Sequence, residues 1–528
     1  MPSLGDLYTR SVKVPVLKRL LGKSRLSNYE QQKRELQKML KTAKHTQFGQ
    51  KYKFEVILNS YHYSHTPSYY YDIFKENVPV HSYNKIFSEW WHRALQGEED
   101  VAWPGKVNIY ALSSGTSESA SKHIPITNDM LKAIKKTGVR QLLSLRNYEL
   151  PTDIFTRGVL MLGGSTSLQV KEGSYHGDLS GIMTSRLPRW FNIFYKPGKK
   201  IAKTKDWSQK LDLITKKAKS WDIGYVAGVP SWMQLLFEKI IAYYKVKTIH
   251  DIWPNLTVFA YGGVAFEPYK TGFEKLLGKP LIYIETYLAS EGFLALQMEP
   301  EKPLRLILNN GIFFEFVPFN SDNFNDEGEL LPNCETLLIN NVKEGIDYAI
   351  LITTVAGTWR YLIGDTIRFI NKKNAEIAIT GRTKHFISLC GEHLSVDNMN
   401  KAIQMVSEDL NITVKEFAVA GIPFDTMFAH KWYIGVDTQV DEELLKIKLD
   451  NYLMELNDDY RTERLSALKD VFINVLPSDL FYKWMKSKGK EGGANKFPRV
   501  LKKDTLKDWE HFIKKESYKT LPEISLSN

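Results

Sequence analysis

Short apolar runs, each ending in glycine or proline, recur through the middle of the chain. Three of them occupy residues 158–164, 224–230 and 256–263. Runs of this length bounded by turn-forming residues predict buried strands, and stretches with helical periodicity, such as residues 232–244, lie between them. Strands that alternate with helices indicate an α/β arrangement with an at least partly parallel sheet, in which ligands gather where the strands end.

The pattern becomes strand-rich after residue 306. Apolar runs at residues 312–316, 348–352 and 366–370 dominate this part of the chain. They predict a more antiparallel or barrel-like region. The fold class is therefore expected to be α/β, of the mixed α+β kind.

Both ends of the chain carry amphipathic segments. Residues 17–43 place leucine and methionine among charged side chains, which predicts one or two helices packed on the main body. Near the other end, helices are predicted over residues 396–406 and 442–456. A polar stretch separates these helices from the strand-rich region, so we place a domain boundary there. The expected domains are a large one of residues 1–383 and a small one of residues 384–528.

The most distinctive loop of the chain follows the apolar run at residues 107–112. Residues 113–121 hold six hydroxyl side chains and one glycine, Lys122 follows, and a helix is predicted over residues 128–145. Backbone N–H groups and short donors on a tight curve, followed by a positive charge, suit a polyphosphate. An ordinary turn rich in serine and glycine has the same composition, so the loop alone does not decide the function.

Composition narrows the class of protein. The 528 residues, 43% of them hydrophobic, are enough for more than one folded domain, and the two cysteines, Cys334 and Cys390, form no disulfide framework. We therefore expect a reducing compartment, and the cytoplasm in particular, because the N-terminal stretch resembles neither a signal peptide nor a membrane span.

The net charge of +11 is spread along the chain without a nucleic-acid-binding motif. We expect neither a nucleic-acid nor a membrane partner.

Further clusters of polar residues complement the hydroxyl-rich loop. They lie at residues 287–292, 360–365, 381–384 and 492–499. Glu291 can hold Mg²⁺ against phosphate oxygens, and Asp365 can accept both hydroxyls of a ribose. Arg382 or Lys496 can neutralise charge that grows on a phosphorus atom.

Each of these clusters also has a plainer interpretation. Ser290 and Glu291 can form a helix N-terminus, Gly364 and Asp365 a turn between strands, and Lys496 can be a solvated lysine. A zinc site at residues 390–393 is not expected, because one cysteine and one histidine do not make a site.

The order and spacing of these motifs resemble those of the Gretchen Hagen family of acyl acid amido synthetases, within the adenylate-forming superfamily. The resemblance rests on residues 113–117 with Lys122, and on residues 287–291, 361–365 and 496–499, and it spans nearly the whole chain. The family was first known from auxin-responsive plant proteins and also occurs in bacteria, and we expect a bacterial member. The resemblance implies the adenylate-forming enzyme fold. That fold has a large N-terminal domain with a β-barrel, β-sheets and flanking helices, and a small mobile C-terminal α/β domain that rotates between two half-reactions.

The resemblance also implies roles for individual residues. The hydroxyl-rich loop would wrap the triphosphate, Asp365 would hold the ribose, Glu291 would help to bind Mg²⁺, and Lys496 would stabilise the adenylation transition state. The residues implied in nucleotide binding are Ser113, Ser114, Gly115, Thr116, Ser117, Lys122, Gly262, Gly263, Val264, Ala265, Tyr287, Ser290, Tyr361, Asp365 and Arg382. Of these, residues 262–265 would line the adenine, Tyr287 and Ser290 would flank the nucleotide, and Arg382 would lie at the hinge.

The function implied is an ATP- and Mg²⁺-dependent ligase. It adenylates a carboxylic acid and then joins the acyl group to an amine, an amino acid by family resemblance, as a monomer. The alternatives are an acyl-CoA ligase of the same superfamily and a nucleotide-binding or scaffold protein that has lost catalysis. Two departures from the plant pattern bear on this choice: Glu118 and Ser119 replace loop glycines, and Leu362 replaces an arginine whose place Arg360 or Arg368 can take.

Overall fold

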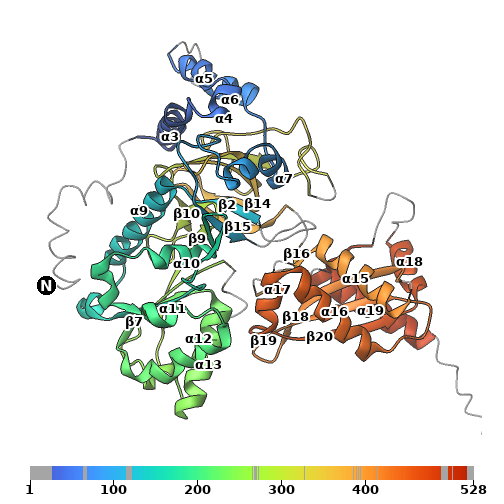
Figure 1. Ribbon diagram of the computed structural model, residues 1–528. Coiled ribbons are helices and arrows are strands. Elements are labelled where there is room, and N and C mark those ends of the chain that lie inside the picture. The colour runs from blue at the N-terminus through green and yellow to red at the C-terminus, as the bar shows by residue number, and fades with distance from the viewer. Residues whose placement is uncertain are drawn as a thin grey trace, which may run out of the picture. The chain divides into compact units, whose positions relative to one another are not determined.

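The computed structural model describes residues 26–62, 68–113, 122–263, 266, 270, 273–325, 328–383, 386–387, 389–390, 392, 394–412, 414–488, 497–501 and 503–519. These residues separate into two compact units, one ending at residue 383 and one beginning at residue 386 (Figure 1). Each unit has its own sheets and its own helices.

One half of the large sheet in the first unit is parallel. Its strands are β3 (Gly158–Leu162), β6 (Tyr195–Lys196), β7 (Ile223–Gly228), β8 (Val258–Gly262) and β9 (Ile282–Ala289). They pair in the order β6, β3, β7, β8, β9, all in parallel. The three glycine-terminated runs of the sequence are thus strands β3, β7 and β8, which confirms the parallel prediction.

The other half of the same sheet is antiparallel. Its strands are β10 (Gly292–Leu296), β11 (Leu304–Leu306), β12 (Ile312–Pro318), β13 (Asp347–Thr354), β14 (Thr358–Asn371) and β15 (Glu376–Arg382). The eleven strands pair in the order β12, β13, β14, β15, β11, β10, β9, β8, β7, β3, β6. The predicted antiparallel pairing is confirmed, and no pairing between β12 and β6 closes a barrel within the described ranges.

A second, four-stranded sheet holds the two ends of the hydroxyl-rich loop. It pairs β2 (Lys122–Pro125), β1 (Ile109–Ser113), β5 (Ser174–Gly177) and β4 (Gln169–Lys171), in that order. Strands β1 and β2 are antiparallel, and Ser113 lies opposite Lys122. The two ends of the loop therefore lie opposite each other on neighbouring strands of this sheet.

Helices surround these sheets (Figure 1). They are α3 (Asn28–Ala43), α4 (Gln47–Lys51), α5 (Phe54–Ser60), α6 (Tyr69–Asn77), α7 (Tyr83–Ile86), α8 (His92–Leu95), α9 (Asn128–Ser144), α10 (Leu179–Ser185), α11 (Lys199–Ala202), α12 (Trp207–Lys217) and α13 (Pro230–Tyr244). Helix α9 begins where the Thr127 side chain accepts a hydrogen bond from Met130 N, and α13 begins with a proline in its first turn. The predicted helices over 128–145 and 232–244 are confirmed, as is the described part of the one over 17–43.

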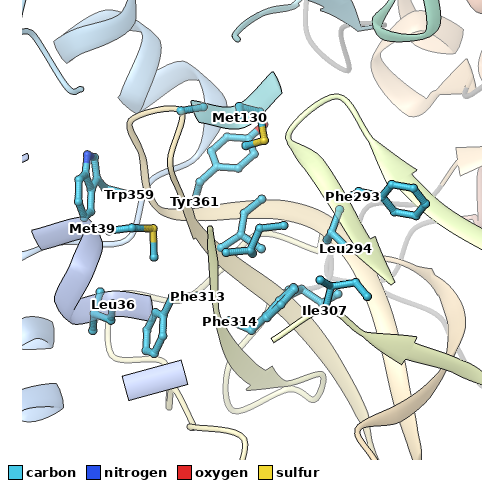
Figure 2. Packing of buried hydrophobic residues seen from close by; sticks show 14 of the residues in the cluster. Leu36, Met39, Met130, Phe293, Leu294, Ile307, Phe313, Phe314, Trp359 and Tyr361 are labelled. Carbon is cyan, nitrogen blue, oxygen red and sulfur yellow. The ribbon is translucent and has the colours of Figure 1, made fainter. Parts of the chain in front are cut away.

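The main core lies between these helices and the antiparallel half of the sheet. Leu36 and Met39 of α3 belong to the same buried cluster as Phe313 of β12 and Trp359 of β14 (Figure 2). Trp359 and Leu36 are completely buried. Side chains of α3 thus close this face of the sheet and hold its strands in place.

The second unit is a small α/β arrangement. A three-stranded sheet of β18 (Glu416–Phe424), β19 (Met427–Gly435) and β20 (Leu468–Leu476) has one antiparallel and one parallel pairing. The remaining elements are β16 (Phe386–Ile387), β17 (Leu394–Ser395), α15 (Val396–Leu410), α16 (Glu442–Leu456), α17 (Asp458–Arg464), α18 (Ser478–Ser487) and α19 (Lys503–Lys519). Helices α15 and α16 confirm the predicted C-terminal helices.

A buried carboxylate lies inside this second unit. Glu392 Oε1 is 3.0 Å from His430 Nε2, and both side chains are completely buried. The same carboxylate accepts hydrogen bonds from the backbone N–H groups of Leu389 and Cys390 and from the Cys390 thiol. These hydrogen bonds hold the segment between β16 and β17 against strand β19.

No helix in the described part of the chain has both the length and the apolar composition that crossing a bilayer requires.

Candidate active site

The ends of parallel strands β8 and β9 meet at one edge of the large sheet. Gly262, the last residue of β8, lies opposite Thr286 of β9, and a Cβ atom at Gly262 would lie 2.4 Å from the Thr286 carbonyl oxygen. Gly263 follows with a φ of +88°, which glycine adopts without strain. Only glycine therefore fits at Gly262, the end of this strand.

Glu291 sits in the turn between β9 and β10. Ala289 pairs with Gly292 across this turn, so Ser290 and Glu291 form a hairpin connection and not a helix N-terminus. Glu291 is 7% exposed. The plainer interpretation of this motif is therefore wrong, and the carboxylate lies in the interior of the first unit.

Asp365 is placed by a bulge in strand β14. Leu362 pairs with Leu351 and Thr366 with Ala349, so three residues of β14 lie opposite one residue of β13. Gly364 lies in this bulge with a φ of +93°. The pair Gly364 and Asp365 thus lies within one long strand, and the interpretation as a turn between strands is wrong.

Two side chains hold the Asp365 carboxylate. Arg382, opposite Asp365 on β15, donates from Nε to Oδ1 at 2.7 Å, and the Tyr287 hydroxyl donates to Oδ2 at 2.5 Å. Asp365 is 9% exposed and Tyr287 is 7% exposed. The three sequence-predicted residues therefore form one hydrogen-bonded group.

This group requires a strongly curled sheet. Strands β15, β11 and β10 separate β14 from β9 in the pairing order, so a flat sheet would place β14 and β9 about 19 Å apart at about 4.8 Å per strand. The 2.5 Å hydrogen bond between Tyr287 and Asp365 shows that the antiparallel half curls back over the end of β9. The barrel-like curvature expected from the sequence is present, although the ring of strands does not close.

Glu291 belongs to the same group. Burial raises the pKa of its carboxyl above the ordinary value, while the charge of Lys122 acts in the opposite direction. Tyr361, which is 1% exposed, has a pKa raised by burial and by the adjacent Glu291, a hydrogen-bond partner of its hydroxyl. Each of the two site carboxylates thus has a buried tyrosine beside it.

Lys122 joins this site from the second sheet. As the first residue of β2 it lies opposite Ser113, and its Nζ atom is 5.2 Å from the centre of the Tyr83 ring. The Tyr83 hydroxyl accepts a hydrogen bond from the backbone of His123 at 2.9 Å. Sequence reasoning missed Tyr83, because it lies forty residues before His123 and in no motif.

The donor set suits a magnesium ion bound together with phosphate. No group of three histidine, cysteine, aspartate or glutamate side chains forms a metal site in the described ranges. Mg²⁺ is commonly held by one or two carboxylates together with substrate phosphates, and Glu291 supplies such a carboxylate. Burial raises its pKa, which means that the ionised form is disfavoured, and a bound cation would favour that form.

Several predicted site residues lie outside the described residues. They are Ser114, Gly115, Thr116, Ser117, Val264, Ala265 and Lys496, together with Glu118.

The two arginines expected to replace the arginine lost at Leu362 are engaged elsewhere. Arg360 is buried in an ion pair with Glu315 at 2.9 Å and donates to the Val78 carbonyl oxygen at 2.7 Å. Arg368 pairs with Asp347 at 2.8 Å on the exposed part of the sheet. Neither guanidinium is part of the group formed by Asp365 and Arg382, so this expectation is wrong.

Three family models match the sequence. They are the GH3 family N-terminal domain over residues 23–168, the central domain over residues 305–382 and the C-terminal domain over residues 397–505, which together cover more than half of the chain.

Curated relatives agree with these models. The chain is 28% identical over 168 residues to the indole-3-acetic acid-amido synthetase GH3.2 of Arabidopsis thaliana, and this match covers 30% of each chain. It is 21% identical over 401 residues to the jasmonoyl-L-amino acid synthetase JAR6 of Nicotiana attenuata, covering 63% of this chain and 67% of the relative. The match to the Arabidopsis protein thus spans less than a third of its length.

Solved structures share the fold. An acyl acid amido synthetase, GH3.15, aligns with a TM-score of 0.56 at 16% identity over 95% of both chains. A 2-hydroxyisobutyryl-CoA ligase, in complex with 2-HIB-AMP and CoA, aligns with a TM-score of 0.56 at 13% identity over 92% of both chains. The fold is therefore that of adenylate-forming enzymes, and with its three matching domain models the chain belongs to the GH3 family.

Proposed function

We propose that this protein is an ATP-dependent acyl acid amido synthetase. It adenylates a small-molecule carboxylic acid and joins the acyl group to an amine, which we take to be an amino acid. The observation that carries this proposal is the meeting of Glu291, Asp365, Tyr287 and Arg382 at one buried point in a chain of the GH3 family. The name of the Arabidopsis relative, an acid-amido synthetase, and that of the Nicotiana relative, a jasmonoyl-L-amino acid synthetase, support the same activity.

The reaction has two steps. In the first, a carboxylate oxygen attacks the α-phosphorus of ATP, the bond to the β-phosphate oxygen breaks, and pyrophosphate leaves. In the second, the amine nitrogen attacks the acyl carbon, AMP leaves with the electrons of the acyl–oxygen bond, and the nitrogen loses a proton. Such chemistry needs mainly positioning and neutralisation of charge.

Each site residue has a role in this scheme. Asp365 accepts hydrogen bonds from the ribose, and Arg382 keeps that carboxylate in place while adding positive charge. Residues 113–117 and Lys122 bind the phosphates, and residues 262–265 line the adenine. Lys496 stabilises the charge of the adenylation step.

Glu291 would hold the magnesium ion. When bound, Mg²⁺ neutralises phosphate charge and polarises the phosphorus centre. The carboxylate must be ionised for this task, and the positive charge of Lys122 favours the ionised form.

An amide product is preferred over a thioester. The fold also matches a CoA ligase, so the fold alone does not separate the two acceptors. The three GH3 domain models and the amido synthetases among the relatives favour an amine. We place the activity in the cytoplasm, on the sequence argument from its cysteines.

Two measurements test the proposal. A screen of carboxylic acids should find at least one that drives exchange of pyrophosphate into ATP in the presence of Mg²⁺. Mass spectrometry of reactions offered both amino acids and coenzyme A should then find an amide. Absence of ATP binding by calorimetry would rule out the enzyme, and a thioester without an amide would rule out the proposed acceptor.

A further inference from the structure

The Tyr287 hydroxyl donates its proton to a neighbouring side chain. It donates to Asp365 Oδ2 at 2.5 Å, and Arg382 Nε donates to Oδ1 of the same carboxylate at 2.7 Å. The sequence led us to expect that Tyr287 merely flanks the nucleotide. Instead, Tyr287 is buried, and its hydroxyl contacts Asp365 through a short hydrogen bond.

Two donors on the two oxygens fix the plane of a carboxylate. The terminal torsion of an aspartate side chain has a broad energy minimum, so an aspartate without such partners rotates freely. Each carboxylate oxygen carries two lone pairs, and one donor per oxygen leaves one lone pair on each. Asp365 can therefore still accept one hydrogen bond at each oxygen, both in a fixed plane.

Two acceptors in one plane match two neighbouring hydroxyl donors. The 2′ and 3′ hydroxyls of a ribose are such a pair, whereas a sugar without them offers no donor. Burial and the nearby Asp365 raise the pKa of Tyr287 well above its ordinary value, so its hydroxyl stays a donor throughout the neutral range.

We propose that Tyr287 is a positioning residue for ribose recognition. Together with Arg382 it orients Asp365 toward both ribose hydroxyls and so makes the enzyme selective for ribonucleoside triphosphates. This inference rests on the proposed function, because it takes Asp365 as the ribose ligand.

The test compares ATP with 2′,3′-dideoxy-ATP in pyrophosphate exchange. The wild-type enzyme should prefer ATP in kcat/KM by about a hundredfold, since each hydrogen bond to a charged acceptor contributes about tenfold. Tyr287→Phe keeps the buried ring and removes only the hydroxyl. It should lower this preference by about tenfold, because Asp365 then loses one of its two fixed partners.

Tyr348→Phe is the matched control. Tyr348 is also buried on this sheet, on strand β13, and its hydroxyl accepts only the backbone N–H of Lys343 among the contacts described, at 2.9 Å. Its substitution should leave the preference for ATP unchanged. Tyr287→Met is a second variant in case the phenylalanine variant does not fold, since methionine fills irregular space without a hydroxyl.

The outcomes separate the inference from its premise. If Tyr287→Phe lowers kcat/KM equally for both nucleotides, Tyr287 only packs in the core and the inference fails alone. If the wild-type enzyme does not distinguish the two nucleotides, Asp365 is not the ribose ligand and the premise fails. Absence of any exchange with either nucleotide contradicts the proposed function itself.

Discussion

Two buried glutamates, one in each unit, differ in how their charge is balanced. Glu392 has an imidazole, a thiol and two backbone N–H groups around its carboxylate, and these hydrogen bonds lower its pKa to about 2 against the opposing effect of burial. Glu291 has Tyr361 as its hydrogen-bond partner, and the charges of Lys122 and Arg382 favour its ionised form, but burial outweighs them and raises its pKa. The same residue type, buried in both places, thus has its ionised form favoured in one place and disfavoured in the other.

The difference separates a structural carboxylate from a functional one. When all the partners of a buried charge come from the fold, removing one member of the group strongly destabilises the protein. A buried charge left partly uncompensated costs stability, and such sites commonly serve binding or catalysis. On this basis Glu392 holds the segment between β16 and β17 in place, and we propose Glu291 as the carboxylate that binds a cation.

The largest effect is expected at Glu392. Glu392→Gln should lower the free energy of unfolding by about 3 to 5 kcal/mol, because His430 and the backbone donors lose their ionised partner inside the second unit. Chemical denaturation followed by tryptophan fluorescence measures this change. Glu392 has a lowered pKa, so its contribution should be present above pH 4.5 and be lost as the pH falls toward 2. A variant as stable as the wild type would show that the network is not structural.

The same substitution at Glu291 should act on the reaction and not on stability. Glu291→Gln keeps an acceptor for Tyr361 but removes the charge, so adenylation should slow by about a hundredfold. The free energy of unfolding should stay the same or rise, because burial disfavours the ionised form. Pyrophosphate exchange and denaturation are measured on both variants. A loss of both stability and activity in either variant would contradict the distinction between Glu392 and Glu291.

A smaller effect concerns the pH dependence of the reaction. The raised pKa of Glu291 means that its carboxyl takes up a proton above pH 4.5 as the pH falls. The acidic limb of kcat/KM for ATP should therefore lie above pH 4.5, and it should be absent in the residual activity of Glu291→Gln. If the limb persists unchanged in that variant, another group causes it.

The smallest effect is expected at Arg368. Its ion pair with Asp347 is largely exposed, and pairs of this kind contribute about 0 to 1 kcal/mol. Arg368→Gln should leave both stability and the KM for ATP near the wild-type values. A clear rise in this KM would show that Arg368 does replace the missing arginine of the third motif.

The sequence is sufficient to predict local elements and to single out candidate site residues. Glycine-terminated apolar runs predict β3, β7 and β8 correctly, because buried parallel strands leave a strong pattern. Glu291 and Asp365 are also found from the sequence, since their motifs occur in a fixed order. Their surroundings cannot be predicted in this way.

The sequence does not reveal which distant segments of the chain come into contact. Tyr287 and Asp365 are 78 residues apart and come together only through the curl of the sheet. Glu392 meets His430, which is 38 residues further along, while the short motif around Cys390 and Glu392 suggests only a poor zinc site. The hairpin position of Glu291 and the bulge at Gly364 depend on strand pairing, which no local pattern specifies.

The junction between the parallel and antiparallel halves of the large sheet also orders the assembly of the protein in time. Strands β12 to β15 are consecutive neighbours and can pair as soon as each is made, whereas β3, β7, β8 and β9 must wait for the helices between them. Tyr287 belongs to the slower half and Asp365 to the faster one. The hydrogen bond between Tyr287 and Asp365 therefore forms only when both halves have joined. We expect nucleotide binding during refolding to appear after the fluorescence change of the buried tryptophan Trp359.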